Sequence, residues 1–407
     1  MNIETSTGLA ALLKQVTGYI YPNEIEIQWS ILIVVYPYIT GLVAGAFILA
    51  SLVKVFNVKE VLPTYRLSLL TALSFLIVAP LPLLFHLGHP LRSFEIFLTP
   101  NLSSAMAMFA FVYAWYLMVV LLLEIWFEYR TDLIRWSEKE KFPTNWFYKV
   151  ISLFSTDTSQ KAVTFDKKAI QAITIIGIPS AFILHGYVGF IFGSIKANPW
   201  WSSVLMPIVF LFSAIVSGIA LVLILYMIIT PSRGEPLDMK CLDKVASFLL
   251  YAIIIDFSLE VLDFIHRLYE SEESIKILSD MVMNRLFLSL VVMQILLGML
   301  LPLGVLILIK ISKFNDELRK LLYFVSAILI QIGIFSTRWN VVFGGQMFSK
   351  SFRGLTTYKL EILGTDGLLS ALILLILPFV ILAILLKILP PWGRRLDNLD
   401  EKEALAG

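Results

Sequence analysis

The chain has 407 residues, of which 58% are hydrophobic and 15% are charged, and its mean hydropathy is +0.84. A soluble domain carries roughly a quarter charged residues, so this composition excludes an ordinary soluble protein and indicates an integral membrane protein. The single cysteine, Cys241, excludes disulfides, a CxxC zinc site and iron–sulfur ligation by this chain, and the net charge of +2 says little about partners.

The N-terminal residues 1–27 hold no apolar run that could cross a bilayer, and the mildly amphipathic stretch 5–22 predicts an extracytoplasmic interfacial segment. Nine apolar runs of roughly 20 residues or more follow, at about 28–56, 65–88, 103–128, 168–194, 203–230, 243–268, 283–311, 318–340 and 366–389. We therefore expect an all-α integral membrane protein with about nine transmembrane helices. The expected parts are a first four-helix bundle (28–194), a second one (203–340), an extracytoplasmic loop (341–365), a final span (366–389) and a tail (390–407).

The lysines and arginines concentrate in the segments that follow odd-numbered spans, above all in the basic loop 129–167. The positive-inside rule makes that side cytoplasmic. We therefore expect a multi-pass protein of the cell membrane with its N-terminus outside and its C-terminus in the cytoplasm. Trp200 and Trp201 fall near a span end and are interpreted as part of an aromatic belt at the membrane interface.

A faint internal repeat relates the first and fifth spans. Gly41 and Gly45 in the first span are matched by Ser213 and Ser217 in the fifth. Small residues four apart let helix backbones approach closely, but such pairs are also common in membrane helices of any kind. Duplication of a four-helix unit and chance resemblance both remain open.

The sixth span carries the densest set of ionisable groups: Asp256, Glu260, Asp263 and Arg267. Their spacing of four, three and four residues places them on one helical face. Carboxylates that run from mid-membrane to one surface are what a proton path requires, whereas a structural network of ion pairs is the alternative. The depth of Asp256 favours the path.

Carboxylates at the inner end of the third span offer a second candidate for proton transfer. Glu124 and Glu128 lie one turn apart there and would take protons from the cytoplasm. Ion pairs with the neighbouring basic loop explain them more simply, and that interpretation is favoured.

The histidines are too few and too poorly spaced for a di-haem centre, because His86 and His89 are close together and His185 is alone on its span. His185 follows Pro179 near the outer end of the fourth span, where a neutral imidazole can exchange a proton with a ring hydroxyl. A bond to a neighbouring backbone carbonyl is the alternative. Arg92 shares the outer end of the second span with His86 and either binds a ligand or holds phospholipid headgroups.

A polar segment follows the eighth span, with Arg338, Asn340 and Gln346 within nine residues. The pair Gly344-Gly345 frees the backbone and predicts a sharp turn in an outer loop. The segment is interpreted either as a docking loop for an extrinsic partner or as part of a ligand pocket.

The order of these motifs resembles the NrfD family of membrane subunits, which includes the polysulfide reductase membrane subunit. The resemblance rests on the His-Leu-Gly-x-Pro-x-Arg ending of the second span, the histidine after a proline in the fourth, Pro-Trp-Trp-Ser at 199–202 and the acidic sixth span. The Arg-Trp-Asn-Val-Val-x-Gly-Gly-Gln run at 338–346 and Leu-Pro-Pro-Trp at 389–392 resemble its longer branch, with the HybB and DsrP subunits, and DsrP most of all.

The resemblance implies a non-autonomous subunit that binds menaquinone near the outer face and carries no haem, iron–sulfur cluster or metal of its own. It would exchange electrons with an extracytoplasmic ferredoxin-like iron–sulfur subunit in a respiratory complex of sulfur metabolism. Other membrane and cytochrome subunits and the lipid bilayer would be partners, and nucleic acid would not. Proton translocation is a further hypothesis.

The candidate residues follow from these arguments together. His185 would exchange protons with the quinone, and His86, Asp263 and Arg267 would lie around it. The full set comprises the catalytic candidates His185, Asp263 and His86, the quinone-binding candidates His185, His86, Arg92, Arg267, Arg338, Asn340 and Gln346, and the proton-path candidates Asp256, Glu260, Asp263 and Glu124.

Three other functions compete with this one. A hydrogenase membrane subunit would share the quinone chemistry, and a purely structural anchor would leave the quinone to another subunit. A proton-coupled secondary transporter would also place acids in mid-membrane, but it predicts spans that are broken near the midplane. Pro302 in the seventh span is the best candidate for such a break.

Overall fold

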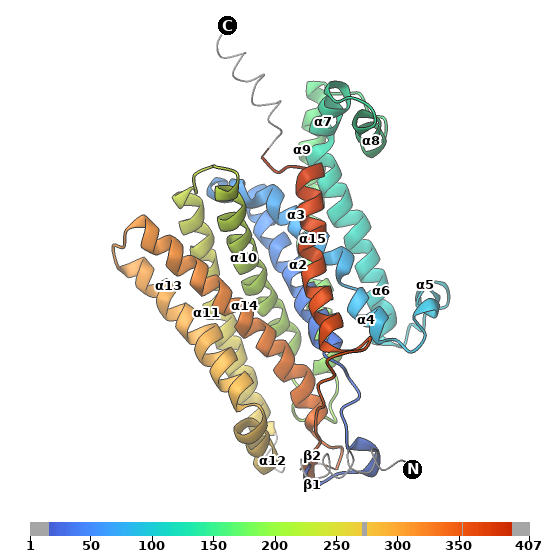
Figure 1. Cartoon of the computed structure of the whole chain (residues 1–407), viewed down its shortest axis with the longest axis vertical. Coiled ribbons are helices and arrows are strands. Elements are labelled where there is room, and N and C mark those ends of the chain that lie inside the picture. Colours follow the sequence, from blue (N-terminus) through green and yellow to red (C-terminus); the bar gives the residue numbers. More distant parts are fainter. Residues whose placement is uncertain (1–15, 271–274, 352, 393–407) are drawn as a thin grey trace.

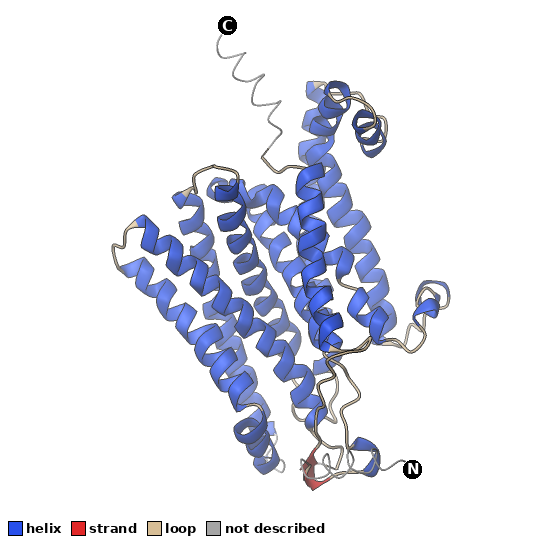
Figure 2. Cartoon of the chain, in the orientation of Figure 1, coloured by secondary structure: helices blue, strands red, loops and turns tan. Residues whose placement is uncertain are grey.

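The computed structural model describes residues 16–270, 275–351 and 353–392, so residues 1–15 of the expected interfacial segment and residues 393–407 of the expected tail lie outside it. Long helices run side by side through nearly the whole described chain, and one short two-stranded ribbon closes one end (Figures 1 and 2). Nine helices of this part are long and apolar enough to cross a membrane. The prediction of an all-α membrane protein with about nine spans is confirmed.

The spans in chain order are α2 (Leu32–Lys54); η2 (Lys59–Val61) with α3 (Leu62–Val78) and α4 (Leu81–His86); α6 (Ala105–Trp115) with η4 (Tyr116–Leu122) and α7 (Leu123–Lys139); α9 (Gln160–Gly193); α10 (Met206–Ser232); α11 (Met239–Glu270); η7 (Phe287–Leu300) with α13 (Leu301–Ile311); α14 (Asp316–Met347); and α15 (Leu368–Ile388). The short elements are β1 (Thr17–Tyr19), η1 (Pro22–Glu24), η3 (Pro90–Arg92), α5 (Glu95–Leu98), α8 (Thr144–Ile151), α12 (Ile275–Asp280), η6 (Met281–Arg285) and β2 (Arg353–Leu355).

Several helices are longer than the apolar runs from which they were predicted. The 34 residues of α9 extend over about 51 Å, against a hydrocarbon thickness of about 30 Å. Helix α7 continues to Lys139, α8 covers Thr144–Ile151 and α9 already begins at Gln160, so most of the expected loop 129–167 is helical. The seventh span passes from η7 into α13 at Leu301 and Pro302 without interruption, so the break that a transporter predicts is not found there.

Helices α2 and α10 form the centre of the bundle. On one side α2 packs against α3 and α9, and on the other α10 packs against α11 and α14. A Cβ atom at Gly45 would lie 2.1 Å from the Ala214 carbonyl oxygen, and one at Gly218 would lie 2.4 Å from the Gly45 Cα. Small residues therefore allow the two backbones to touch, as expected for close packing of membrane helices.

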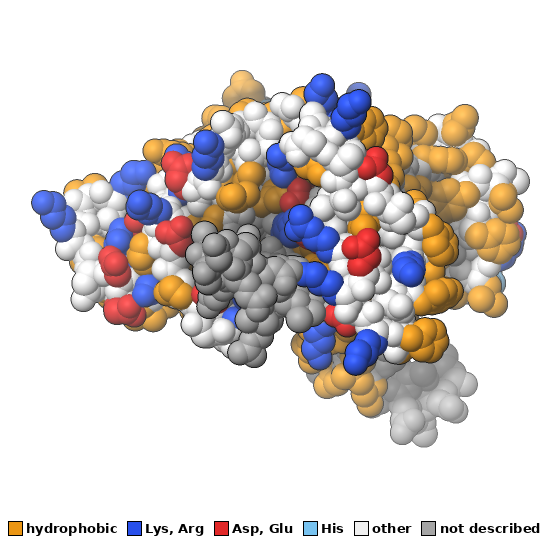
Figure 3. All heavy atoms as spheres, turned by 90° about the horizontal axis from the view of Figure 1, so that it is seen from above, with side chains coloured by type: hydrophobic (Ala, Val, Ile, Leu, Met, Phe, Trp, Pro, Cys, Tyr) orange, Lys and Arg blue, Asp and Glu red, His pale blue; other side chains and the backbone are white. Residues whose placement is uncertain are grey.

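The two ends of the bundle differ. At one end, β1 pairs antiparallel with β2, and Glu24 accepts a hydrogen bond from the Ser349 hydroxyl at 2.6 Å. This ribbon fixes the N-terminal segment to the segment after α14. At the other end lie α8 and the ends of α7 and α9, and Lys and Arg side chains are spread over that face (Figure 3). We call these the ribbon end and the α8 end.

Candidate functional site: a buried ionisable cluster beside a lateral cavity

A chain of polar side chains links α11, η7 and α14 inside the bundle. The Gln294 amide donates to Glu260 at 2.7 Å, and the Asn340 amide donates to the Gln294 carbonyl oxygen at 2.7 Å. The Ser289 hydroxyl in turn donates to Asn340. Gln294 projects from the π-helical part of the seventh span, a helix form that is frequent at functional sites.

Arg338 lies behind this chain and is completely buried. Its guanidinium donates to the Ser213 hydroxyl at 2.6 Å and lies 3.2 Å from His185 Nε2. Because a guanidinium only donates, Nε2 accepts and the imidazole carries its proton on Nδ1. A Cβ atom on Gly41 would lie 3.2 Å from the imidazole, so this glycine leaves the ring just enough room. Phe210 covers the guanidinium, with its ring centroid 4.2 Å away.

The acids that offset the charge of Arg338 come from α11. Asp256 is completely buried, and Arg338 interacts electrostatically with both Asp256 and Glu260. Within the described residues, neither carboxylate oxygen of Asp256 has a hydrogen-bond partner, and the same holds for Arg338 Nε and Nη1. Buried charges are costly without compensation, and this cluster retains unused capacity to bind protons or polar groups.

The ribbon-end half of the α11 face is organised differently. Asp263 accepts hydrogen bonds from the Ser203 hydroxyl and from the Arg267 guanidinium, which also donates to the Trp200 carbonyl oxygen at 2.8 Å. Asp263 thus forms an ion pair with Arg267, which lies one turn farther along α11. The four ionisable residues of α11 do share one side of the helix, as their spacing predicts. Two of them, Asp256 and Glu260, lack an ion pair of this kind.

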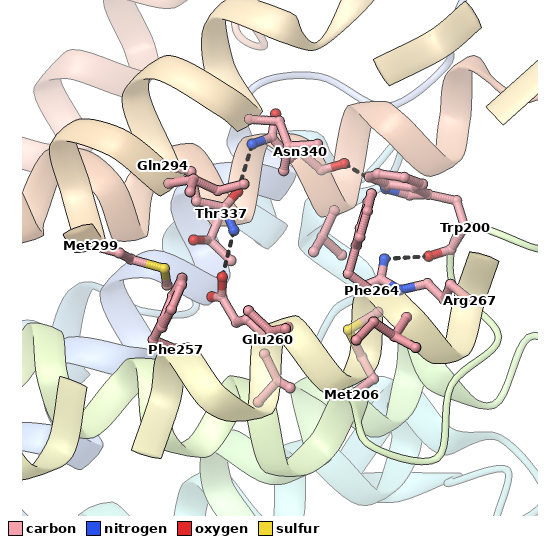
Figure 4. A pocket seen from close by; sticks show the side chains of 16 residues that line it. Trp200, Met206, Phe257, Glu260, Phe264, Arg267, Gln294, Met299, Thr337 and Asn340 are labelled. Carbon is pink, nitrogen blue, oxygen red and sulfur yellow. Dashed lines mark hydrogen bonds between the residues drawn. The ribbon is translucent and has the colours of Figure 1, made fainter. Parts of the chain in front are cut away.

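A cavity of about 180 Å³ lies between α10, α11, η7 and α14, next to the polar chain. Glu260, Arg267, Gln294, Thr337 and Asn340 supply its polar wall (Figure 4), and most of the other lining residues are apolar, among them Phe257, Phe264, Val261, Ile265, Ile295 and Met299. Val261 and Ile265 are also exposed on the outer surface of the bundle. The cavity therefore reaches the face that would contact lipid.

The remaining outer-end candidates are not brought to this cavity. His86 Nδ1 lies 3.2 Å from the Ser30 hydroxyl and 3.5 Å from an Asp366 carboxylate oxygen. Arg92 forms an exposed pair with Glu95 at 3.0 Å. Gln346 is half-buried near the end of α14, and its backbone carbonyl oxygen accepts from the Thr356 hydroxyl.

Glu124 is completely buried near the α8 end, where it accepts hydrogen bonds from Tyr65 at 3.2 Å and Thr174 at 2.9 Å. Glu128 pairs with Lys54 at 2.8 Å and Arg66 at 2.9 Å. Glu128 is thus held in ion pairs, as predicted, but its partners lie on α2 and α3 and not in the basic segment 129–167. Both of these partners of Glu124 are neutral hydroxyls.

The turn predicted at Gly344-Gly345 is wrong, because α14 continues through both residues to Met347. A Cβ atom at Gly345 would lie 2.0 Å from the Trp201 ring, and one at Gly344 would lie 2.5 Å from Trp200 Nε1. The glycines thus admit two indoles, whose nitrogens donate to backbone carbonyls one turn earlier in α14. Trp200 and Trp201 are buried and do not belong to an interfacial belt.

The sequence interpretation missed Gln294, Ser289 and Ser213. Gln294 and Ser289 are the polar side chains of the otherwise apolar stretch 286–309, which is a signal that could have identified them. Ser213 was noted only for its size, yet it is a hydrogen-bond partner of Arg338. Among the described residues, no group of three or more His, Cys, Asp or Glu is arranged to hold a metal ion.

This fold and site define a polytopic membrane protein with an ionisable cluster inside the bilayer region and a lipid-facing cavity beside it. The family model described as polysulphide reductase, NrfD, matches residues 22–350, and the chain belongs to this family. The resemblance to the NrfD family inferred from the sequence motifs is thereby confirmed.

Relatives of the chain include components of reductases. The selenate reductase C subunit of Mesobacillus selenatarsenatis is 32% identical over 327 residues, which are 77% of this chain and 73% of that protein. A putative dimethyl sulfoxide reductase membrane C subunit of Halobacterium salinarum is 27% identical over 51% of this chain and 46% of that protein. Protein NrfD of Escherichia coli is 27% identical over 49% of this chain and 59% of that protein.

Proposed function

We propose that this chain is the quinone-reactive membrane subunit of a multisubunit respiratory oxidoreductase. It would exchange electrons between the menaquinone pool of the membrane and an iron–sulfur subunit docked at the ribbon end. Membership of the NrfD family and the reductase subunits among its relatives support this proposal.

The observation that carries the proposal is the lateral cavity with one polar wall. A quinone has an apolar tail that stays in lipid and two ring oxygens that need hydrogen-bond donors and acceptors. Asn340 and Gln294 offer amide groups, Arg267 offers a donor and Glu260 offers an acceptor, all on the cavity wall. Apolar side chains line the remainder, as is usual in pockets for small molecules.

Oxidation of a quinol releases two electrons and two protons, and the site residues can account for the protons. Glu260 lines the cavity and would accept the first proton, pass it to Asp256, one turn away on α11, and then accept the second. Both carboxylate oxygens of Asp256 are free of hydrogen bonds to the described residues. Arg338 would stabilise the ionised form of Glu260 electrostatically and connect it to Asp256 and His185 deeper in the bundle. In this proposal His185 acts through Arg338, because its ring is completely buried behind the cavity. The electrons would pass to the iron–sulfur cluster of the partner.

The distribution of charge supports an orientation for the chain in the membrane. The α8 end, which carries the basic 129–167 segment, would face the cytoplasm under the positive-inside rule. The ribbon end would then face outward, together with Asp263, Arg267 and the 348–367 segment. An extracytoplasmic iron–sulfur subunit would dock there, above the cavity.

The terminal substrate of the complex would be a sulfur or selenium compound. The names of the family and of two relatives refer to polysulphide, selenate and dimethyl sulfoxide. The Arg-Trp-Asn-Val-Val-x-Gly-Gly-Gln run at 338–346 supports a place in the longer branch with DsrP.

The test compares Glu260→Gln with Glu235→Gln in the purified complex. The amide introduced by Glu260→Gln would keep the size of the glutamate and could still accept from Gln294, but it cannot take up a proton. We expect quinol oxidation to fall by about 100-fold or more, the usual contribution of a positioned proton acceptor, with subunit assembly unchanged. Glu235 is exposed in the turn between α10 and α11, away from both the cavity and the ribbon end, so its variant should oxidise quinol normally. Wild-type rates in Glu260→Gln would exclude this site.

A further inference from the structure

Segment 141–154, which includes α8, presents large apolar side chains to the outside. Phe142 is 81% exposed, Leu153 71% and Phe154 68%, and Trp146 and Phe147 are exposed as well. We call these five residues the apolar knob. A group of this kind on a protein surface marks an interaction site.

Contacts with the spans fix the depth of the knob. The Trp126 indole of α7 donates to the Ile151 carbonyl oxygen at 3.0 Å. The Tyr148 hydroxyl donates to the carbonyl oxygen of Ile388, the last residue of α15, also at 3.0 Å. Segment 141–154 is therefore attached to the end of the last span, where we expect the lipid headgroups to begin.

The backbone at the tip of the knob is strained. Leu153 and Phe154 have φ values of 53° and 57°, in the left-handed region that non-glycine residues rarely adopt. Two successive bulky residues adopt it here, and both side chains point away from the protein. Strain of this kind persists only where the surrounding structure imposes it, and it is found mainly at functional sites.

A buried arginine holds the tip in place. Arg130 pairs with Asp166 of α9 at 2.7 Å, and both side chains are buried. Its Nη1 donates to the Ser155 hydroxyl at 3.1 Å and to the Asp157 carbonyl oxygen at 2.6 Å. The chain just beyond Phe154 is thus attached to α7 and α9, and the knob is a fixed feature of the fold.

The charges within segment 141–154 are positive, although Glu138 and Glu140 precede it and Asp157 follows it. Lys141 and Lys149 are exposed, and segment 141–154 contains no acidic residue. Lys161, Lys167 and Lys168 follow near the start of α9. Apolar and aromatic side chains bordered by lysines are typical of segments that lie in the interface of a membrane with anionic lipids.

We propose that segment 141–154 is an interfacial anchor, which inserts the apolar knob among the acyl chains while Lys141 and Lys149 bind anionic phospholipid headgroups. The partner of this surface is therefore the lipid leaflet at the α8 end. The anchor would hold α7 and α9 upright where these helices extend beyond the hydrocarbon. It is independent of the proposed quinone chemistry.

The first test measures the depth of the knob with nitroxide spin labels in the full chain. Cys241 is replaced by Ala, and a label is attached either in Phe154→Cys or in the control Thr158→Cys, which lies four residues farther on an exposed polar stretch. The proteins are placed in vesicles of phosphatidylglycerol and phosphatidylcholine. We expect the ratio of collisions with oxygen to collisions with a water-soluble nickel chelate to be several-fold higher at 154 than at 158.

The second test addresses the charge of the lipid. Native mass spectrometry would count phosphatidylglycerol molecules retained by the wild type and by Lys141→Gln/Lys149→Gln, with Lys350→Gln at the ribbon end as control. We expect the double variant to retain fewer than the wild type and the control to retain the same number. Equal retention in all three would overturn the headgroup assignment.

Two results of the labelling test would overturn the insertion itself. Equal collision ratios at 154 and 158 would place the knob in water. A label at 154 that is shielded from both reagents in the complex, but open to the nickel chelate in the subunit alone, would assign the knob to a protein partner instead.

Discussion

The electrostatic coupling between Arg338 and Asp256 gives the sharpest test of the buried cluster. Arg338→Met keeps the side-chain volume but removes the bonds to Ser213 and His185, and it leaves the acids of α11 without their cation. Arg338 and Asp256 form no direct hydrogen bond, but removal of the cation leaves buried carboxylates uncompensated, and the loss of one partner from a buried charged network costs up to about 3–5 kcal/mol. We expect a loss of that size in the free energy of unfolding, because Arg338 is completely buried.

A double-mutant cycle isolates the pair. Asp256→Asn in the Arg338→Met background should recover part of the loss, with a coupling of about 0.5–3 kcal/mol, as found for residues of one charged network. Unfolding of the four proteins would be followed in lipid bicelles. The exposed pair Arg92 and Glu95 is the matched control, and its coupling should stay below about 0.5 kcal/mol. Additive effects of Arg338→Met and Asp256→Asn would refute the electrostatic link.

Three further predictions address other parts of the structure. Gly218→Ala should cost about 1–3 kcal/mol of stability by separating α2 from α10, whereas Gly304→Ala, where a Cβ would meet no atom within 4 Å, should be neutral or slightly stabilising in thermal unfolding. If the cluster moves protons across the membrane, Asp256→Asn should abolish the quinol-driven pH change in proteoliposomes; an unchanged dye signal would exclude that role. The hydrogen bond from the backbone amide of Ser159 holds the pKa of the Asp157 carboxyl below its ordinary value of 3.8. The ionised Asp157 therefore stabilises the loop at any pH above 3.8, and this stabilisation is lost as the pH falls through the lower pKa of the folded protein. Hydrogen exchange at 155–160 should therefore accelerate only in that acidic range, and Asp157→Asn should show the fast rate throughout.

The number of spans was predictable because each apolar run alone meets the length that a bilayer requires. The ends of the helices were not predictable, because hydropathy marks only the part of a helix that lies in lipid. Helices α7, α9 and α14 continue beyond that part. Gly344-Gly345 shows the same limit at one site. A glycine pair permits a turn, but here the space it leaves is filled by Trp200 and Trp201 from another part of the chain.

The α11 part of the site was predictable because residues three and four apart share one helical face. Its partners were not, since the sequence does not say which helices surround α11. His86 and His185 illustrate this difference. His86 lies beside Ser30, and His185 lies beside Gly41. Ser30 and Gly41 are eleven residues apart, which corresponds to roughly 16 Å along a helix. Two histidines that the motifs grouped together are therefore separated.

Photolabelling with an azido-menaquinone tests the proposed quinone site most directly. The complex would be labelled in its native membrane, and the modified peptides would be identified by mass spectrometry. We predict adducts within 257–265 of α11, 290–299 of the seventh span and 337–341 of α14, all suppressed by excess unlabelled menaquinone. Adducts confined to the surroundings of His86 and Ser30, with none on these three segments, would contradict the proposal.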